Sequence, residues 1–173
     1  KALYHFSEEP DIAIFHPRPP LARPEVEPMV WAIDDWHAPM YYFPRDCPRA
    51  CFWPSAGTTA DDRERWFGHV GAKMVIAVES AWLDRIRSAV LYRYALPPES
   101  FTLDDETAGH WVSRETIAPL AVEPVGDLLE ALTTANVELR ITPSLYELWQ
   151  RVIASTLAYS GTRLRNAAGW PAG

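Results

Sequence analysis

The chain has 173 residues, 48% of them hydrophobic and 23% charged, which fits a globular domain with a full hydrophobic core and excludes disorder over most of its length. Its formal net charge of −7 argues against extended nonspecific binding to nucleic acid or acidic membranes, because a basic excess drives such binding. No apolar run approaches the roughly 20 residues of a membrane-spanning helix. The sequence does not open on a charged-then-apolar signal segment, so we expect a cytoplasmic protein with no membrane partner.

The first third of the sequence predicts short strands joined by rigid connections. Strands are expected at residues 2–6, 29–33 and 50–53, where short apolar runs stand between turn-forming residues. Ser7 can cap a helical turn over residues 8–15, and residues 36–43 can form one or two further turns. Between them, residues 16–28 contain five prolines, a composition that predicts an extended, rigid loop.

The middle of the sequence predicts one helix before a buried strand and one helix after it. That strand is expected at residues 73–79, which are apolar until their acidic end. Thr59 can cap a helix at residues 60–69, whose first turn carries two aspartates. Beyond the strand, residues 81–88 are expected to form a short helix and residues 90–96 a further strand.

The last third predicts more short strands and the longest helix. Residues 101–109 contain three consecutive acidic side chains and are expected to form an exposed loop. Strands are expected at residues 111–112, 117–122 and 138–141, and a helix at residues 127–135. Apolar residues recur at helical spacing over residues 145–159, which predicts a long helix with Trp149 in its buried face, stopped at Gly161.

These elements do not alternate strictly between strand and helix. About six to eight short strands with four or five helices favour an α+β fold with a mixed or mainly antiparallel β-core and flanking helices. We therefore predict a single α+β domain at residues 1–166 and a flexible tail at residues 167–173.

The stretch Met29–Trp53 has the densest set of chemically useful side chains. It holds three tryptophans, two tyrosines and two phenylalanines beside histidine, arginine and cysteine. Cys47 and Cys51 could supply metal ligands with His37, but a zinc site usually has a second pair of cysteines or histidines. Their spacing also allows a disulfide. We expect reduced, structural thiols and no metal.

Four side chains are candidates for catalysis, and each also has a purely structural interpretation. They are His5, His37, Glu79 and Glu115. His37 could be a general base oriented by Asp34 or Asp35, although those two residues could equally cap a helix. The imidazole of His5 could bind a ligand or bond to backbone inside the core. The two glutamates could stabilise a developing positive charge, or serve in a cap or a salt bridge.

Five side chains are candidates for ligand binding. They are Arg18, Tyr41, Tyr42, Arg45 and Arg49. The arginines could clamp a pyrophosphate or a carboxylate with paired donors, whereas an ion pair between Arg45 and Asp46 would only fix the loop. A tyrosine could stack on a base, while most other rings are expected in the core. His5 and the loop at residues 45–49 both interrupt apolar strands with polar groups, so we expect them to face one cleft.

The segments LYHFSEEPDI, HPRPP, VWAID, YYFPRDCPR and FW resemble an uncharacterised bacterial domain family of unknown function. More distantly, LYHF, VWAIDDWHAPMYYF, LYRYALPPESF and HWVSRETIAPLAV are similar to segments of ADP-ribosyltransferases and RNA 2′-phosphotransferases. That resemblance implies a split antiparallel β-core around an NAD cleft, with His5 at the nicotinamide ribose and Tyr41 or Tyr42 stacked on nicotinamide. The diphtheria-toxin-like branch has an acidic residue where this sequence has His110.

Together these patterns predict a domain that binds an anionic or nucleotide-like small molecule, with NAD as a candidate substrate and ADP-ribosyl transfer as a candidate reaction. In that hypothesis arginines hold the phosphates, a tyrosine stacks on the base and an acidic residue stabilises the developing cation. The alternative is a noncatalytic binding or protein-interaction domain, in which the aromatic stretch forms a core and a partner surface. Neither a resident cofactor nor an oligomeric state follows from the sequence.

Overall fold

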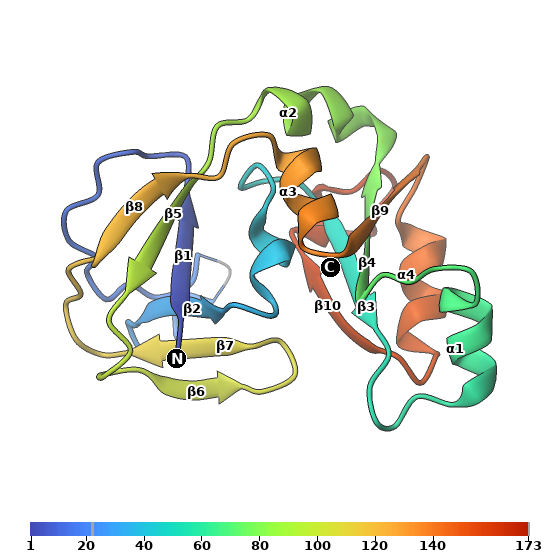
Figure 1. The fold of residues 1–173 in the computed structure, drawn as a ribbon, viewed down its shortest axis with the longest axis horizontal. Helices are drawn as coiled ribbons and strands as arrows, with labels where there is room; N and C mark the ends of the chain where they lie inside the picture. Colours follow the sequence, from blue (N-terminus) through green and yellow to red (C-terminus); the bar gives the residue numbers. More distant parts are fainter. Residues whose placement is uncertain (22, 173) are drawn as a thin grey trace. The chain divides into compact units, whose positions relative to one another are not determined.

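The computed structural model describes residues 1–21 and 23–172, and the chain divides into two compact units (Figure 1). Unit 1 comprises Lys1–Tyr41 and Val90–Gly126, and unit 2 comprises Tyr42–Ala89 and Asp127–Gly173. Each unit has its own β-sheet, and nearly all neighbouring strands are antiparallel. The predicted α+β class with a mainly antiparallel β-core is therefore confirmed. The single domain expected at residues 1–166 stays a prediction.

Six antiparallel strands form the sheet of unit 1, in the order β6-β7-β2-β1-β5-β8 (Figure 1). Along the chain they are β1 (Leu3–Ser7), β2 (Val30–Asp34), β5 (Tyr92–Leu96), β6 (Thr102–Asp105), β7 (His110–Ser113) and β8 (Ala121–Pro124). A short 3₁₀ helix, η1 (Ala38–Tyr41), follows β2. Strands β1 and β2 and helix η1 all lie where the sequence predicts strands and helical turns.

Alternate side chains of the central strands build the core of unit 1. Leu3, Val30, Ala32, Tyr94 and Leu96 are buried in one cluster. Burial of each large apolar side chain contributes about 1.5–3 kcal/mol. This core fixes which face of β2 is hidden, and so fixes the direction in which the end of β2 presents its polar residues.

The segment after β1 forms no helix, so the helical turn expected at residues 8–15 is wrong. The Tyr94 hydroxyl donates a hydrogen bond to the Glu9 carbonyl and accepts one from the Ile12 N–H (3.2 Å). These tertiary bonds from β5 satisfy backbone groups that a helix would have paired locally, and they hold the segment against the core.

The sequence predictions for unit 1 are wrong at its two edge strands. Residues 101–109, expected to form a loop, contain β6. The strand expected at residues 117–122 begins later, as β8, and Ile117 only forms an isolated bridge with Phe15. Every residue of β6 and β8 is exposed. A strand without a buried face lacks the alternating apolar pattern on which a strand prediction depends.

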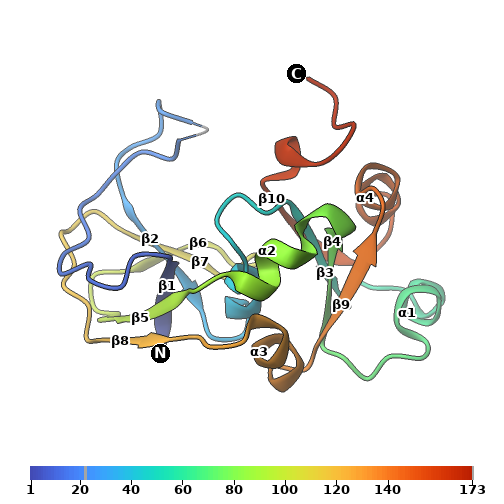
Figure 2. The ribbon, with the colours of Figure 1, turned by 90° about the horizontal axis from the view of Figure 1, so that it is seen from above.

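Unit 2 has a four-stranded sheet in the order β10-β3-β4-β9, in which β9 is parallel to β4. Its strands are β3 (Arg49–Trp53), β4 (Met74–Glu79), β9 (Val137–Thr142) and β10 (Ala158–Thr162). Its helices are α1 (Ala60–Phe67), α2 (Leu83–Ser88), α3 (Leu128–Thr134) and α4 (Tyr146–Ile153), with 3₁₀ turns η2 (Ser80–Trp82) and η3 (Leu164–Asn166). Helices α1 and α4 lie on one face of the sheet, and α2 and α3 on the other (Figure 2).

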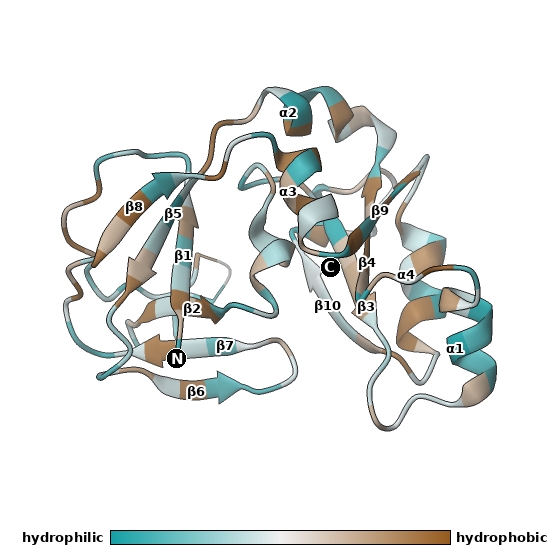
Figure 3. Ribbon diagram, viewed as in Figure 1, coloured by the Kyte–Doolittle hydropathy of each residue, from teal (hydrophilic) through white to brown (hydrophobic). Residues whose placement is uncertain are grey.

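Strand β4 is the centre of unit 2. All of its residues are buried, and most of the strand is hydrophobic, whereas α1 is mainly hydrophilic (Figure 3). Phe52 and Val75 pack against Phe67 of α1 and Val152 of α4. Helix α1 begins as predicted, because Thr59 Oγ1 accepts a hydrogen bond from the backbone N–H in its first turn (3.2 Å).

Helix α4 is shorter than the helix predicted at residues 145–159. It ends at Ile153, and the chain returns beside β3 as β10. Gly161, expected to stop the helix, lies within β10, where an added Cβ would come within 2.8 Å of the Trp149 ring. Apolar spacing continues to Leu157 because this residue, just before β10, is buried in the same core as α4, so periodicity alone overestimates the helix.

The C-terminal segment is anchored to unit 2. Ala167 is buried, the Ala168 N–H donates a hydrogen bond to Glu79, and Trp170 packs against the Ala167 cluster. The tail expected to be flexible from residue 167 therefore keeps contact with unit 2 as far as Trp170.

Candidate functional site

The end of β2 carries a carboxylate–imidazole pair. Asp34 Oδ1 accepts a hydrogen bond from the His37 backbone N–H (3.0 Å) and lies 2.8 Å from His37 Nδ1. His37 is 9% exposed. An ionised carboxylate only accepts hydrogen bonds, so Nδ1 carries the proton and donates it to Asp34. In the neutral ring Nε2 is then the basic nitrogen, which is the tautomer of a carboxylate-oriented general base.

A second imidazole lies on β7, paired with a phenol from η1. The Tyr41 hydroxyl oxygen lies 2.7 Å from His110 Nε2, a distance typical of a good hydrogen bond. Burial lowers the pKa of His110 below its ordinary value, and the carboxylates of Asp105 and Asp104 partly oppose that shift. The ring is therefore neutral near pH 7, with one donor and one acceptor nitrogen.

The turn between β6 and β7 contacts both pairs. Asp105 lies across from His110 in the strand register, and its Oδ1 accepts the Ala108 N–H (3.0 Å). The carbonyl of the next residue, Gly109, accepts the Asp34 N–H (3.1 Å). One turn thus brings two imidazole pairs together. We call the set Asp34, His37, Tyr41, Gly109 and His110 the histidine cluster.

Aromatic rings border the histidine cluster. The Trp36 ring lies 4.7 Å from the His37 ring, centroid to centroid, and Trp36 is 40% exposed. The Trp31 ring meets His110 edge to face at 6.0 Å. Within the described part of the chain the Trp31 indole Nε1 is buried without a hydrogen-bond partner. Planar rings beside two imidazoles offer surfaces on which a flat ligand group can stack.

His5, a predicted catalytic residue, is linked to the histidine cluster through Trp31. It is half-buried on β1, its Nδ1 lies 3.2 Å from the Trp31 carbonyl, and its ring packs on Phe15 at 4.8 Å. Trp31 contacts His5 with its backbone and His110 with its ring. These contacts fit the backbone-bonded alternative, and a role of His5 in catalysis stays a prediction.

Arg18 and Glu115 lie in unit 1 but outside the histidine cluster. Arg18 is exposed in the proline-rich loop, where its backbone pairs with Met29. Glu115 is exposed after β7, and its N–H donates to Ser113 Oγ (3.1 Å). Their predicted ligand-binding and catalytic roles stay predictions.

Glu79 lies at the end of β4, where it is 3% exposed. Its Oε2 accepts the Leu145 N–H (3.2 Å), and its Oε1 accepts the Ala168 N–H (2.9 Å). The carboxylate therefore fixes the start of α4 and the C-terminal segment. These bonds match a structural interpretation of Glu79, and its catalytic role stays a prediction.

The remaining predicted ligand-binding residues, Tyr42, Arg45 and Arg49, belong to unit 2. Arg49 is buried, donates to the Cys47 carbonyl (2.8 Å) and lies over the Phe43 ring at 5.3 Å. Arg45 is exposed, and Tyr42 is half-buried. Since His5 lies in unit 1, the predicted cleft shared by His5 and residues 45–49 stays a prediction.

The two cysteines are buried thiols without a disulfide. Burial raises the pKa of Cys47 to about 11 and that of Cys51 to about 12. Neither thiol is ionised near neutral pH, whereas a thiolate is the form that binds metals or attacks electrophiles. Over residues 1–21 and 23–172, no group of three or more histidine, cysteine, aspartate or glutamate side chains is placed to hold a metal ion.

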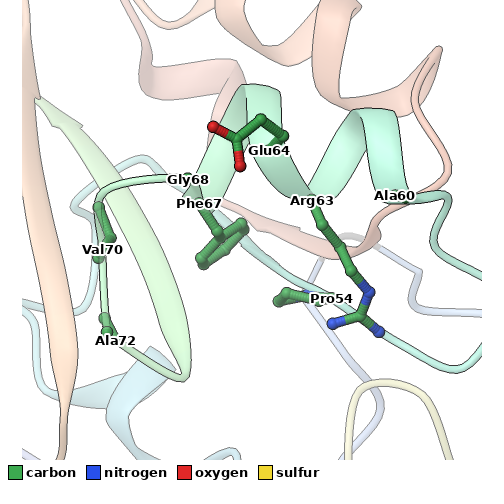
Figure 4. A pocket seen from close by; sticks show the side chains of 9 residues that line it. Pro54, Ala60, Arg63, Glu64, Phe67, Gly68, Val70 and Ala72 are labelled. Carbon is green, nitrogen blue, oxygen red and sulfur yellow. The ribbon is translucent and has the colours of Figure 1, made fainter.

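An open groove of about 460 Å³ lies beside α1 in unit 2 (Figure 4). Apolar side chains, including Phe67, Pro54 and Val70, form part of its lining. Arg63 also lines it and donates a hydrogen bond to the Ser55 carbonyl (2.7 Å). The groove lacks a pair of hydrogen-bonded titratable side chains in its lining, so the histidine cluster is the stronger candidate site.

His37, its carboxylate and Tyr41 are recognisable as candidate site residues in the sequence, whereas Gly109 is not, and His110 stands out only as a departure from a family pattern. The available signal is weak. A glycine and a histidine follow shortly after the acidic residues 104–106, a pattern that suggests a turn between two strands. Because β6 has no apolar alternation, that turn is not recognisable as part of a hairpin.

The comparisons with known proteins place the chain in one family. No curated protein and no solved structure gives a significant match. In the described part of the chain no helix has the length and apolar character needed to cross a membrane. A family model matches residues 4–167, which include the histidine cluster and most of both units. The chain therefore belongs to the family of unknown function DUF6886.

Proposed function

We propose that this chain is an enzyme whose acid–base site is the histidine cluster of unit 1. The observation that carries the proposal is the Asp34–His37 hydrogen bond of 2.8 Å beside the Tyr41–His110 pair at 2.7 Å. The pairs are two titratable groups in different environments, an arrangement that suits removal of a proton by one pair and hydrogen bonding to the substrate by the other.

In this proposal His37 takes a substrate proton at Nε2, and Asp34 stabilises the resulting imidazolium through Nδ1. In ADP-ribosyl transfer that proton comes from the acceptor nucleophile, which forms a bond to ribose C1′ while the bond from C1′ to nicotinamide breaks, and nicotinamide leaves as a neutral base. The Tyr41–His110 pair hydrogen-bonds to the substrate, because a phenol oxygen can both donate and accept and a neutral imidazole has one nitrogen of each kind. The lowered pKa of His110 keeps that ring neutral near pH 7.

The proposed substrate is nucleotide-like, with NAD as the first candidate and ADP-ribosyl transfer as the reaction to test. The aromatic rings beside the imidazoles support a ligand with a planar group. The sequence resemblance implies further details of this proposal. In them the protein is bacterial and cytoplasmic, and His5 approaches the nicotinamide ribose.

The test is a ligand screen followed by activity measurements on matched variants. NAD, ADP-ribose, nicotinamide and adenosine are added separately, and the melting temperature is measured. A ligand at about 100 times its Kd stabilises the folded state by roughly 2.7 kcal/mol, which is readily detected. Nicotinamide release from NAD is then compared in wild type, His37→Gln and His16→Gln. His16 is an exposed histidine of unit 1 outside the cluster.

We expect His37→Gln to lower the rate by about 10²–10⁴-fold and His16→Gln to leave it unchanged. If none of the four compounds stabilises the protein, the nucleotide-like substrate is wrong. If NAD binds but releases no nicotinamide, or if the two variants behave alike, the acid–base role is wrong. A noncatalytic binding domain then becomes the better description.

A further inference from the structure

Gly109 packs its backbone directly against the Asp34–His37 pair. Its φ is +72°, in the left-handed region that favours glycine. An ideal Cβ at this position would overlap His37 Nδ1 and lie 2.6 Å from His37 Cγ and 2.8 Å from Asp34 Oδ2. Contacts below 3.0 Å are essentially never made by real Cβ atoms. Any side chain here would therefore displace the imidazole, the carboxylate or the turn.

The backbone of Gly109 also bonds to the backbone of Asp34, the partner of His37 in the pair. Its carbonyl accepts the Asp34 N–H (3.1 Å), and Asp34 in turn accepts both the backbone N–H and Nδ1 of His37. His110, the next residue, bonds to Tyr41. The close approach at Gly109 is thus part of one chain of contacts that runs through both imidazole pairs.

We infer that Gly109 is a positioning residue of the acid–base site, an inference that rests on the proposed function. Because Gly109 has no Cβ, the β6–β7 turn can pack against the Asp34–His37 pair and hold the imidazole with Nδ1 toward the carboxylate. Nε2 is thereby kept as the basic nitrogen. Gly109 acts through His37 and does not itself touch the reacting atoms.

Gly126 supplies a matched control in the same unit. Its φ is +82°, and a Cβ there would have no heavy atom within 4 Å. Alanine at either position pays the same kind of backbone strain. The collision with His37 and Asp34 occurs only at position 109, so the difference between Gly109→Ala and Gly126→Ala isolates the effect on the pair.

The experiment measures the His37 tautomer from imidazole ¹⁵N chemical shifts at alkaline pH in wild type, Gly109→Ala and Gly126→Ala. We expect the Nδ1-protonated form in wild type and Gly126→Ala, and its loss in Gly109→Ala. Nicotinamide release should fall in Gly109→Ala toward the level of His37→Gln and stay at the wild-type level in Gly126→Ala.

If Gly109→Ala alone does not fold, the inference is tested by measuring the free energy of unfolding of the glycine variants in a protein that also carries His37→Ala. In a His37→Ala protein the ring that the new Cβ would meet is absent. The destabilisation caused by Gly109→Ala should then shrink toward that caused by Gly126→Ala.

A wild-type His37 tautomer in Gly109→Ala overturns the inference, as does a Gly109→Ala penalty that His37→Ala does not reduce. The proposed function fails separately. If Gly109→Ala changes the tautomer while His37→Gln has normal turnover, Gly109 still positions the pair, but the pair is not the catalytic base.

Discussion

Two carboxylates at strand ends, the half-buried Asp34 and the buried Glu79, show how similar residues serve different purposes. Asp34 ends β2 and pairs with the titratable ring of His37, so its charge can bear on proton transfer. Glu79 ends β4 and accepts hydrogen bonds from the backbone N–H groups of Leu145 and Ala168. Asp34 and Glu79 look equivalent in the sequence, because each follows an apolar run. What distinguishes them is the partner that the fold delivers.

Glu79→Ala is expected to destabilise the protein by about 2–6 kcal/mol, since it leaves two backbone donors without their acceptor at roughly 1–3 kcal/mol each. Glu79→Gln keeps one acceptor oxygen and should cost about half as much. Denaturant unfolding measures both, and Glu64→Gln, an exposed residue of α1, serves as the control. A Glu79→Gln protein with wild-type stability but no activity would instead favour the catalytic role.

We expect the protein to lose stability at alkaline pH because its two thiols are buried. Burial raises the pKa of Cys47 to about 11 and of Cys51 to about 12, from the ordinary thiol value of 9.0. The folded state therefore holds these protons while the unfolded state releases them. The stabilisation is fully present below about pH 9 and is lost as the pH rises through the raised pKa values.

Between about pH 9.5 and 10.5 the free energy of unfolding should fall by up to roughly 1.4 kcal/mol per pH unit for each thiol. The measurement is denaturant unfolding at several pH values for wild type and the double variant Cys47→Ala/Cys51→Ala. The double variant should lose most of that slope. An unchanged slope would mean that other groups control the alkaline transition.

At the scale of elements, burial decides which parts of the fold can be predicted from the sequence. Strand β4 is buried throughout and α1 has a capped start, so both lie where they are expected. Strand β6 is exposed throughout and is not recognisable. The same asymmetry limits the site prediction. His37 stands beside its carboxylate in the sequence, but its contact with Gly109 depends on the β6–β7 turn.

Trp149 links α4 to β10, the strand that begins at Ala158, near the end of the range predicted as helix. Its ring meets Tyr159 edge to face at 5.4 Å and lies against Gly161. Trp149→Ala is expected to cost about 3 kcal/mol, the lower end for tryptophan truncation because the ring is half-buried. Arg45→Ala, at an exposed side chain, should change stability by less than about 0.5 kcal/mol. Melting curves that show equal losses would mean that the Arg45 loop also serves the fold.

At the scale of the whole molecule, the path of the chain argues for cooperative folding. The chain passes from one unit to the other after residues 41, 89 and 126, so each unit is built from two separate segments. Strand pairs β1–β5 in unit 1 and β4–β9 in unit 2 join segments that lie far apart in the sequence. Unfolding of one unit would lengthen the loops that the other unit must close, which costs conformational entropy.

We therefore expect the two units to unfold as the single domain that the sequence predicts. Leu96→Ala in unit 1 and Ile76→Ala in unit 2 each remove a buried side chain and should cost about 2–5 kcal/mol. Native-state hydrogen exchange reports the opening free energy of amides in β1 and in β4 separately. In one cooperative domain, Leu96→Ala lowers both values equally, and Ile76→Ala does the same, because the slowest amides exchange through global unfolding. A loss confined to the unit that carries the substitution would show two independently folding domains.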